Sequence, residues 1–193
     1  MEKLLTRWGE TLNKELPLND YPRPQLKRDS FINLNGEWNY AIYDEYKKFA
    51  GFQGKIIVPF SPECILSGVE KMVEPTDILY YQKLFEFKRT NHRVLLHFGA
   101  VDYECKVILN NTVIGEHKGG YLPFTFDVTA AILDGENDLR LEVKDPTDTG
   151  SQARGKQTFK RGGIWYTPQS GIWQTVWLGE GCEGYIESIK LTP

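Results

Sequence analysis

The chain has 193 residues, with 23 lysines and arginines against 26 aspartates and glutamates, and a net charge of −3. Hydrophobic residues make up 40% and charged residues 25%, which is typical of a globular domain and excludes a disordered chain. The balanced charge gives no general electrostatic footprint for nucleic acid or an anionic membrane, so we expect neither as a partner.

The first thirty residues are predicted to form an arm. They show no basic region followed by an apolar stretch and a cleavage site, and no run of about 18 apolar residues occurs anywhere, so we expect a cytoplasmic protein. Large apolar residues recur at i, i+4 spacing, but a glycine weakens that helix and prolines break residues 17–24. We expect residues 1–30 to lie over the main domain or over something outside this chain. The recurring residues are Leu4, Trp8, Leu12 and Leu16.

From residue 34 onward the hydrophobic pattern has a period of two. Strict alternation with one apolar face is typical of a half-buried antiparallel strand. About ten short strands separated by turn signals predict an all-β fold, an antiparallel β-sandwich or jelly roll, as one domain over residues 31–193. The segments that alternate or are continuously apolar are residues 38–42, 56–58, 79–88, 93–98, 103–109, 139–143, 174–179 and 185–191.

Two local features can be placed within this pattern. Asn110 and Asn111 separate two apolar runs, and asparagine tolerates the positive φ that a two-residue type I′ turn needs, so we predict a hairpin there. Residues 127–133 are predicted to form at most one helical turn. The three cysteines are odd in number and widely spaced, which favours buried structural thiols over a disulfide framework. They are Cys64, Cys105 and Cys182.

Residues 145–174 break the alternation and contain five glycines. A connection of this length without its own secondary structure is uncommon and usually functional, so we expect a long loop near the C-terminal end and a site on it. Asp145 and Asp148 are typical of an Asx turn, or one of them accepts hydrogen bonds from a polar ligand.

The aromatic and basic residues of this loop leave two interpretations open. Trp165, Tyr166 and Trp173 either plug the core or form a flat apolar platform for the C–H face of a sugar ring. The polar residues near them form either a solvated stripe or the polar half of such a pocket. These residues are Arg154, Lys156, Gln157, Lys160 and Arg161.

No motif indicates a cofactor or a metal. Gly150 to Lys156 resembles a phosphate-binding loop, but the next residue is Gln157 where that motif needs serine or threonine, and no helix is predicted to follow. The three histidines are isolated and show no metal-ligand spacing, and no serine elbow is present. We therefore expect no cofactor and no metal in this chain. His97 is expected to be a packing or surface residue on its strand.

Residues 33–38, 98–128 and 163–178 carry a recognisable family pattern. They resemble the N-terminal sugar-binding domain of glycoside hydrolase family 2, which contains β-galactosidases, β-glucuronidases and β-mannosidases. The resemblance implies a galactose-binding-like jelly roll that opens a longer retaining enzyme, followed by an immunoglobulin-like domain and a (β/α)8 barrel with two catalytic glutamates. A barrel of about 250 residues cannot fit in this chain, so we expect a domain fragment without hydrolytic activity whose parent is a glycosidase.

The same resemblance assigns roles to loop residues. It implies that Asp148 contacts a sugar hydroxyl and that Arg154, Lys156 and Gln157 line the substrate site or an interdomain segment. Trp165 stands where glucuronidase-like members carry an aspartate, which argues against a glucuronide preference and for an aromatic wall with Tyr166.

Three functions remain open at this stage. The expected one is an accessory domain that shapes the substrate site of a β-glycosidase and supports its barrel; a free-standing carbohydrate-binding module and a purely structural interface domain are the alternatives. Expected partners are a β-glycoside, the downstream domains of the same polypeptide and, as one option, a second copy of the chain.

Overall fold

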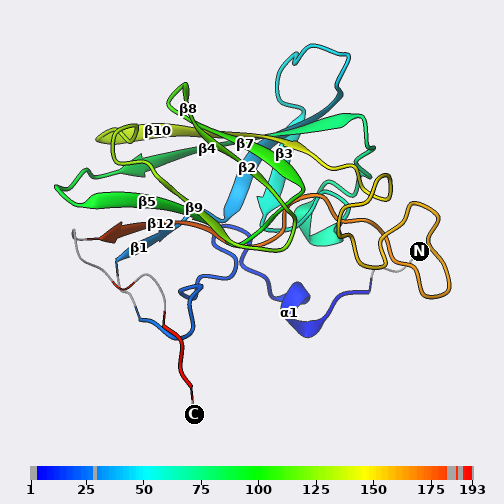
Figure 1. Cartoon of the computed structure of the whole chain (residues 1–193), viewed down its shortest axis with the longest axis horizontal. Coiled ribbons are helices and arrows are strands. Elements are labelled where there is room, and N and C mark those ends of the chain that lie inside the picture. The colour runs from blue at the N-terminus through cyan, green and yellow to red at the C-terminus, as the bar shows by residue number, and fades with distance from the viewer. Residues whose placement is uncertain (1–3, 28–29, 182–185, 187–188, 193) are drawn as a thin grey trace.

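The structure is a computed structural model, and it describes residues 4–27, 30–181, 186 and 189–192. Two antiparallel sheets face each other across one apolar core, as Figure 1 shows, and this confirms the predicted all-β sandwich. One sheet has the strand order β3-β2-β4-β10-β7-β8, and the other has the order β1-β12-β5-β9. A short ribbon pairs β11 with β6.

The described elements are almost all strands. The two helical segments are α1 (Arg7–Glu10) and a 3-10 turn, η1 (Ile65–Ser67). The strands are β1 (Phe31–Asn33), β2 (Gly36–Asp44), β3 (Gly54–Val58), β4 (Asp77–Phe87), β5 (Arg93–Phe98), β6 (Val101–Asp102), β7 (Glu104–Leu109), β8 (Thr112–Lys118), β9 (Phe124–Asp127), β10 (Gly135–Lys144), β11 (Gly171–Ile172) and β12 (Val176–Gly181). Within the described ranges, no helix has the length and apolar character that crossing a membrane would require.

Alternation along the strands builds the core as the sequence predicts. In β10, Leu139, Leu141 and Val143 are buried, whereas Arg140 and Glu142 point away from the core. Successive side chains of a strand face opposite sides, so each apolar residue lands on the inner face of the six-stranded sheet. The expected loop is also present, since no strand occurs between the end of β10 and β11.

The hairpin between β7 and β8 is confirmed. Asn110 and Asn111 have φ angles of 50° and 63°, both in the left-handed region that a type I′ turn needs. The Asn110 amide fixes the turn to the next connection: it donates to the Ala131 carbonyl and to Asn137 at 2.8 Å each, and accepts from the Asp138 N–H at 2.9 Å. Residues 127–133 contain the expected single turn.

In β5 both faces are buried, because the arm covers the outer face of the four-stranded sheet. The Pro17 carbonyl accepts from the Asn35 side chain at 3.1 Å, and the rings of Tyr21 and Phe31 meet edge to face at 5.2 Å. His97 stacks on Trp177 with ring centroids 4.8 Å apart, in agreement with its predicted packing role. The described part of the arm thus lies over the sandwich.

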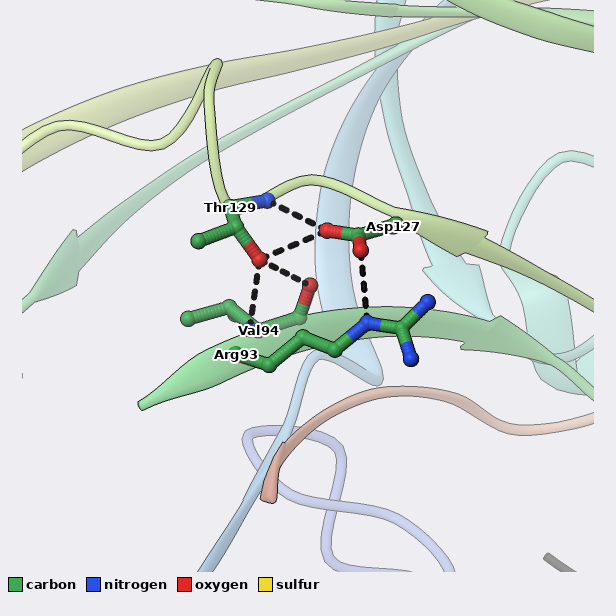
Figure 2. A network of polar contacts seen from close by, with 4 residues as sticks. All are labelled: Arg93, Val94, Asp127 and Thr129. Carbon is green, nitrogen blue, oxygen red and sulfur yellow. Dashed lines mark hydrogen bonds and ion pairs between the residues drawn. The ribbon is translucent and has the colours of Figure 1, made fainter. Parts of the chain in front are cut away.

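A polar network holds the start of β5 in place. Figure 2 shows Asp127 accepting hydrogen bonds from Arg93 at 2.6 Å and from the N–H and hydroxyl of Thr129 at 3.0 and 2.6 Å. The Thr129 hydroxyl also accepts from the Val94 N–H at 2.9 Å. Asp127 thus fixes the turn after β9 to the start of β5.

Three sequence expectations need correction. The strand expected at 185–191 is absent from its described residues, 186 and 189–191, whose apolar side chains are exposed and have no described strand to pair with. The strand expected at 174–179 begins two residues later and ends at Gly181. The arm, in contrast, agrees with the weak helix that the sequence predicts: its apolar stripe forms only the four-residue α1, and Leu4, Trp8 and Leu16 are exposed. Of the cysteines, Cys105 is buried as expected, Cys64 is only partly buried, and Cys182 lies outside the described residues.

Candidate functional site in the long loop

The base of the long loop, residues 145–170, is tied together by Asp145. Its Oδ1 accepts from the Thr147 N–H at 2.7 Å, which is the Asx turn that the sequence allowed. Its Oδ2 accepts from the Ser170 hydroxyl at 2.7 Å, so one carboxylate joins the first and last residues of the loop. Asp145 is buried and is therefore not available to a ligand.

Two further carboxyl groups lie at this base, and we call Glu63, Asp102 and Asp145 the carboxylate cluster. Glu63 accepts from the backbone N–H groups of Ser170 at 3.1 Å and Val73 at 3.3 Å. Burial raises the pKa of Glu63 to about 7. Burial, together with the negative charges of Asp145 and Glu63, also raises the pKa of Asp102 to about 7. The pKa of Asp145 is raised by burial as well.

Gln157 connects this cluster to the outer part of the loop. Its side chain hydrogen-bonds Asp102, and its Oε1 accepts from the Gln169 N–H at 2.6 Å. Gln169 is held in turn by a short hydrogen bond from Ser61. Because a buried polar group is costly unless it is paired, these bonds fix where Gln157 lies.

Asp148 holds the middle of the loop. It accepts from the Thr158 hydroxyl at 2.7 Å and from the Phe159 N–H at 3.1 Å. These hydrogen bonds and the nearby Arg154 guanidinium hold the pKa of Asp148 below its ordinary value, so the carboxylate is charged at neutral pH. Arg154 donates to the Gly150 carbonyl at 2.9 Å and stays close to the same segment.

The outermost part of the loop is a narrow turn. The Tyr166 N–H donates to the Lys156 carbonyl at 2.9 Å, and the Thr158 N–H donates to the Tyr166 carbonyl at 3.0 Å. Gly162 and Gly163 have positive φ angles and allow the chain to reverse. Trp165 and Tyr166 are 47% and 66% exposed, so the core-plug interpretation is wrong for both.

Trp173 behaves differently from these two residues. It is partly buried, its indole N–H donates to the Gly120 carbonyl at 2.8 Å, and its ring meets Tyr121 edge to face at 6.2 Å. Trp173 therefore anchors the return of the chain to the sandwich.

A cavity of about 270 Å³ opens on the loop, and four of the six predicted site residues line it. They are Asp148, Arg154, Gln157 and Trp165, and the cavity is completed by Thr158 and Lys160. The other two predicted residues, Lys156 and Tyr166, share the adjoining backbone ladder but do not line the cavity. Trp165 makes one side of the cavity aromatic. The other lining residues supply hydrogen-bond donors and acceptors, among them positively and negatively charged side chains.

The sequence did not reveal Glu63, Ser170 or Gln169 as part of this region, because they lie in no recognisable motif and reach the loop only through the fold. Asp102 gave a weak signal, as a charged residue within an otherwise apolar strand pattern. Among the residues that the structure describes, no three histidine, cysteine or acidic side chains are grouped so as to hold a metal ion.

Comparison with known proteins identifies the domain family and several longer relatives. The family model described as "Glycosyl hydrolase 2 galactose-binding domain-like" matches residues 69–173. A β-galactosidase of Thermoanaerobacter pseudethanolicus is 28% identical over 156 residues, which cover 76% of this chain and 20% of the relative. A β-glucuronidase of Streptococcus agalactiae is 26% identical over 107 residues, which cover 54% of this chain and 18% of the relative.

Solved structures agree on the fold. A β-D-mannosidase from Dictyoglomus thermophilum superposes with a TM-score of 0.62 at 19% identity, over 79% of this chain and 23% of that one. The curated relatives are much longer than this chain, which spans about a fifth of their length.

Proposed function

The chain belongs to the glycosyl hydrolase 2 galactose-binding domain-like family, and on that premise we propose that it is the non-catalytic N-terminal domain of a retaining β-glycosidase. In this role the domain shapes one side of the substrate site and orients the sugar, while the catalytic carboxyl groups come from another part of the same enzyme. The observation that carries the proposal is the loop cavity formed by four of the six predicted residues.

The chemistry of the cavity fits a sugar. The exposed face of Trp165 offers an apolar surface to the C–H groups of a pyranose ring, and the charged Asp148 accepts hydrogen bonds from hydroxyl groups. Arg154 and Lys160 supply donors on the other side. At about 270 Å³ the cavity lies just below the roughly 300–1,000 Å³ of complete ligand pockets, which fits half of a site.

The arrangement of carboxyl groups supports a non-catalytic role. A retaining glycosidase needs two carboxyl groups about 5–5.5 Å apart across the glycosidic bond. Among the residues that the structure describes, Asp148 is the one acidic residue that lines the cavity. The carboxylate cluster lies at the loop base, where its groups bond the chain itself. The names of the curated relatives support a β-galactoside or β-glucuronide as the substrate class, and the aromatic wall at Trp165 favours the former.

Two measurements on the chain test this proposal. Incubated with p-nitrophenyl β-D-galactoside and β-D-glucuronide, the chain should release no nitrophenol. In an amide NMR titration with galactose, glucuronate and mannose, resonances of residues 145–170 should show no saturable shifts at millimolar sugar, because half of the site is missing. Turnover that Asp148→Asn abolishes would contradict a non-catalytic role. Saturable shifts confined to the loop would show a self-sufficient sugar-binding module instead.

A further inference from the structure

The outer face of the six-stranded sheet carries aromatic residues where charged ones are expected. The connection between β2 and β3 rises above this sheet (Figure 1), and we call its residues 45–53 the strap. Phe49 of the strap is 45% exposed, and its ring lies 4.9 Å from that of Tyr80 on β4 and 5.2 Å from that of Phe52. Phe52 and Tyr80 are partly buried, so the cluster presents a partly exposed aromatic surface on this face, a feature that interaction sites share.

The strap is held in place by its own hydrogen bonds. The Gln53 side chain accepts from the Ile42 N–H and donates to the Ile42 carbonyl, each at 3.1 Å, and the Tyr43 hydroxyl donates to the Gly51 carbonyl at 3.0 Å. The aromatic wall therefore exists before any ligand binds, which lowers the entropic cost of binding.

Two cavities lie beside this wall. The first, of about 320 Å³, is lined by Phe49, Phe52 and Tyr80, and by Arg140 and Glu142 of β10. The second, of about 350 Å³, lies over β10, β7 and β8 among alternating charged side chains and shares Glu142 with the first. The two therefore adjoin at Glu142, and we call the surface that they cover together, from the strap to β8, the groove. Because strands lie about 4.8 Å apart, the groove crosses roughly 14 Å from β4 to β8.

The groove's chemistry identifies its ligand class. Positively charged lysines and negatively charged glutamates line the groove together. Its electrostatic potential is therefore not uniformly positive, as binding of a polyanion such as nucleic acid would favour. Charged groups are depleted from the centres of protein–protein interfaces, which argues against a docked domain. An aromatic wall next to a planar guanidinium and a carboxylate suits a neutral chain rich in hydroxyl groups.

We propose that this groove, formed by the strap and the outer face of β4, β10, β7 and β8, binds a neutral β-linked oligosaccharide. Phe49 and Phe52 pack against sugar rings, while Arg140 donates to hydroxyl groups and Glu142 accepts from them. The groove is separate from the loop cavity and shares no lining residue with it. Its function would be to hold a polysaccharide chain independently of the sugar at the loop.

Isothermal titration calorimetry of the chain with β-1,4-galactotetraose and cellotetraose tests this proposal, with galactose as the single-ring control. We expect saturable binding of at least one tetrasaccharide and much weaker binding of galactose. Phe49→Ala and Glu142→Gln should each weaken binding by about tenfold, the effect of losing one good contact. Matched controls are Tyr46→Ala, an exposed strap residue outside the groove, and Glu86→Gln, an exposed carboxyl on β4; both should leave binding unchanged.

The conservative Glu142→Gln variant keeps the test valid if Phe49→Ala reduces folding. Trp165→Ala separates the two sites, because it alters the loop cavity and leaves the groove intact. No binding of either tetrasaccharide at millimolar concentration would overturn the proposal. Binding that is lost in Trp165→Ala and retained in both groove variants would overturn it as well, as would a dimer that Phe49→Ala dissociates.

Discussion

Replacing Glu63 by glutamine should flatten the pH dependence of folding stability. Burial raises the pKa of Glu63 from an ordinary 4.5 to about 7, so the folded state favours the protonated carboxyl. The associated stability is fully present below the unfolded-state pKa and is lost as the pH rises through about 7. A pKa difference of about 2.5 units corresponds to at most roughly 3.4 kcal/mol of stability lost between pH 4 and pH 8.

Burial also raises the pKa values of Asp102 and Asp145, so their contributions to folding stability fall as the pH rises too. The charge of Asp145 raises the pKa of Asp102 further, so the two groups titrate together. Glu63→Gln should therefore reduce the slope of stability against pH without removing it, and adding Asp102→Asn should reduce it further. The absolute stability of Glu63→Gln is a poorer readout, since an amide cannot accept both N–H groups that Glu63 accepts, and this alone costs about 1–3 kcal/mol.

Urea unfolding followed by tryptophan fluorescence at pH 5, 6, 7 and 8 measures these slopes. Glu86→Gln, which removes an exposed carboxyl on β4, is the matched control and should keep the wild-type slope. The reasoning fails if wild-type stability is flat or rises between pH 5 and pH 8. It also fails if Glu63→Gln loses stability with pH as steeply as the wild type.

Three further outcomes are expected. Gly171→Ala should lower the free energy of unfolding by about 2–4 kcal/mol, because the added Cβ would lie 2.1 Å from the Tyr81 hydroxyl. Gly68→Ala, at a similar positive φ but in open space, should cost only about 1–2 kcal/mol, and equal losses in urea titrations would contradict this. Asp127→Ala should cost about 1–2 kcal/mol at pH 7 and less in acid, because its hydrogen bonds outweigh burial and hold its pKa below the ordinary value; a cost that does not shrink with falling pH would refute it. Burial raises the pKa of Cys105 to about 12, so a thiol reagent should label it only after urea unfolding, and rapid native-state labelling identified by mass spectrometry would contradict this.

Local patterning explains why much of the fold could be predicted. Period-two alternation located the inner faces of β7 and β10, and the two asparagines at 110–111 located a hairpin whose φ angles are both positive. These signals act between neighbours in the sequence. The strand expected at 185–191 shows the limit of such signals, because an alternating segment becomes a strand only where a partner strand is available.

The candidate site was only partly predictable for a related reason. The lack of alternation after Lys144 indicated the loop, and the aromatic and charged residues on it indicated a pocket. The carboxylate cluster joins residues 63, 102 and 145, which lie far apart in the sequence and come together only when β6 and two connections meet. Burial creates their shared electrostatics, and no spacing in the sequence encodes that burial.

The most direct test of the proposed function is the kinetics of loop variants in the longer protein that we propose to be a β-glycosidase containing this chain. Trp165→Ala and Asp148→Asn should each lower kcat/KM for aryl β-glycosides by about tenfold or more, because the sugar loses orienting contacts. Tyr46→Ala, in the strap between β2 and β3, is the control and should leave kcat/KM unchanged. A kcat/KM within about twofold of wild type in both loop variants, at unchanged Tm, would contradict a role of this loop in the substrate site.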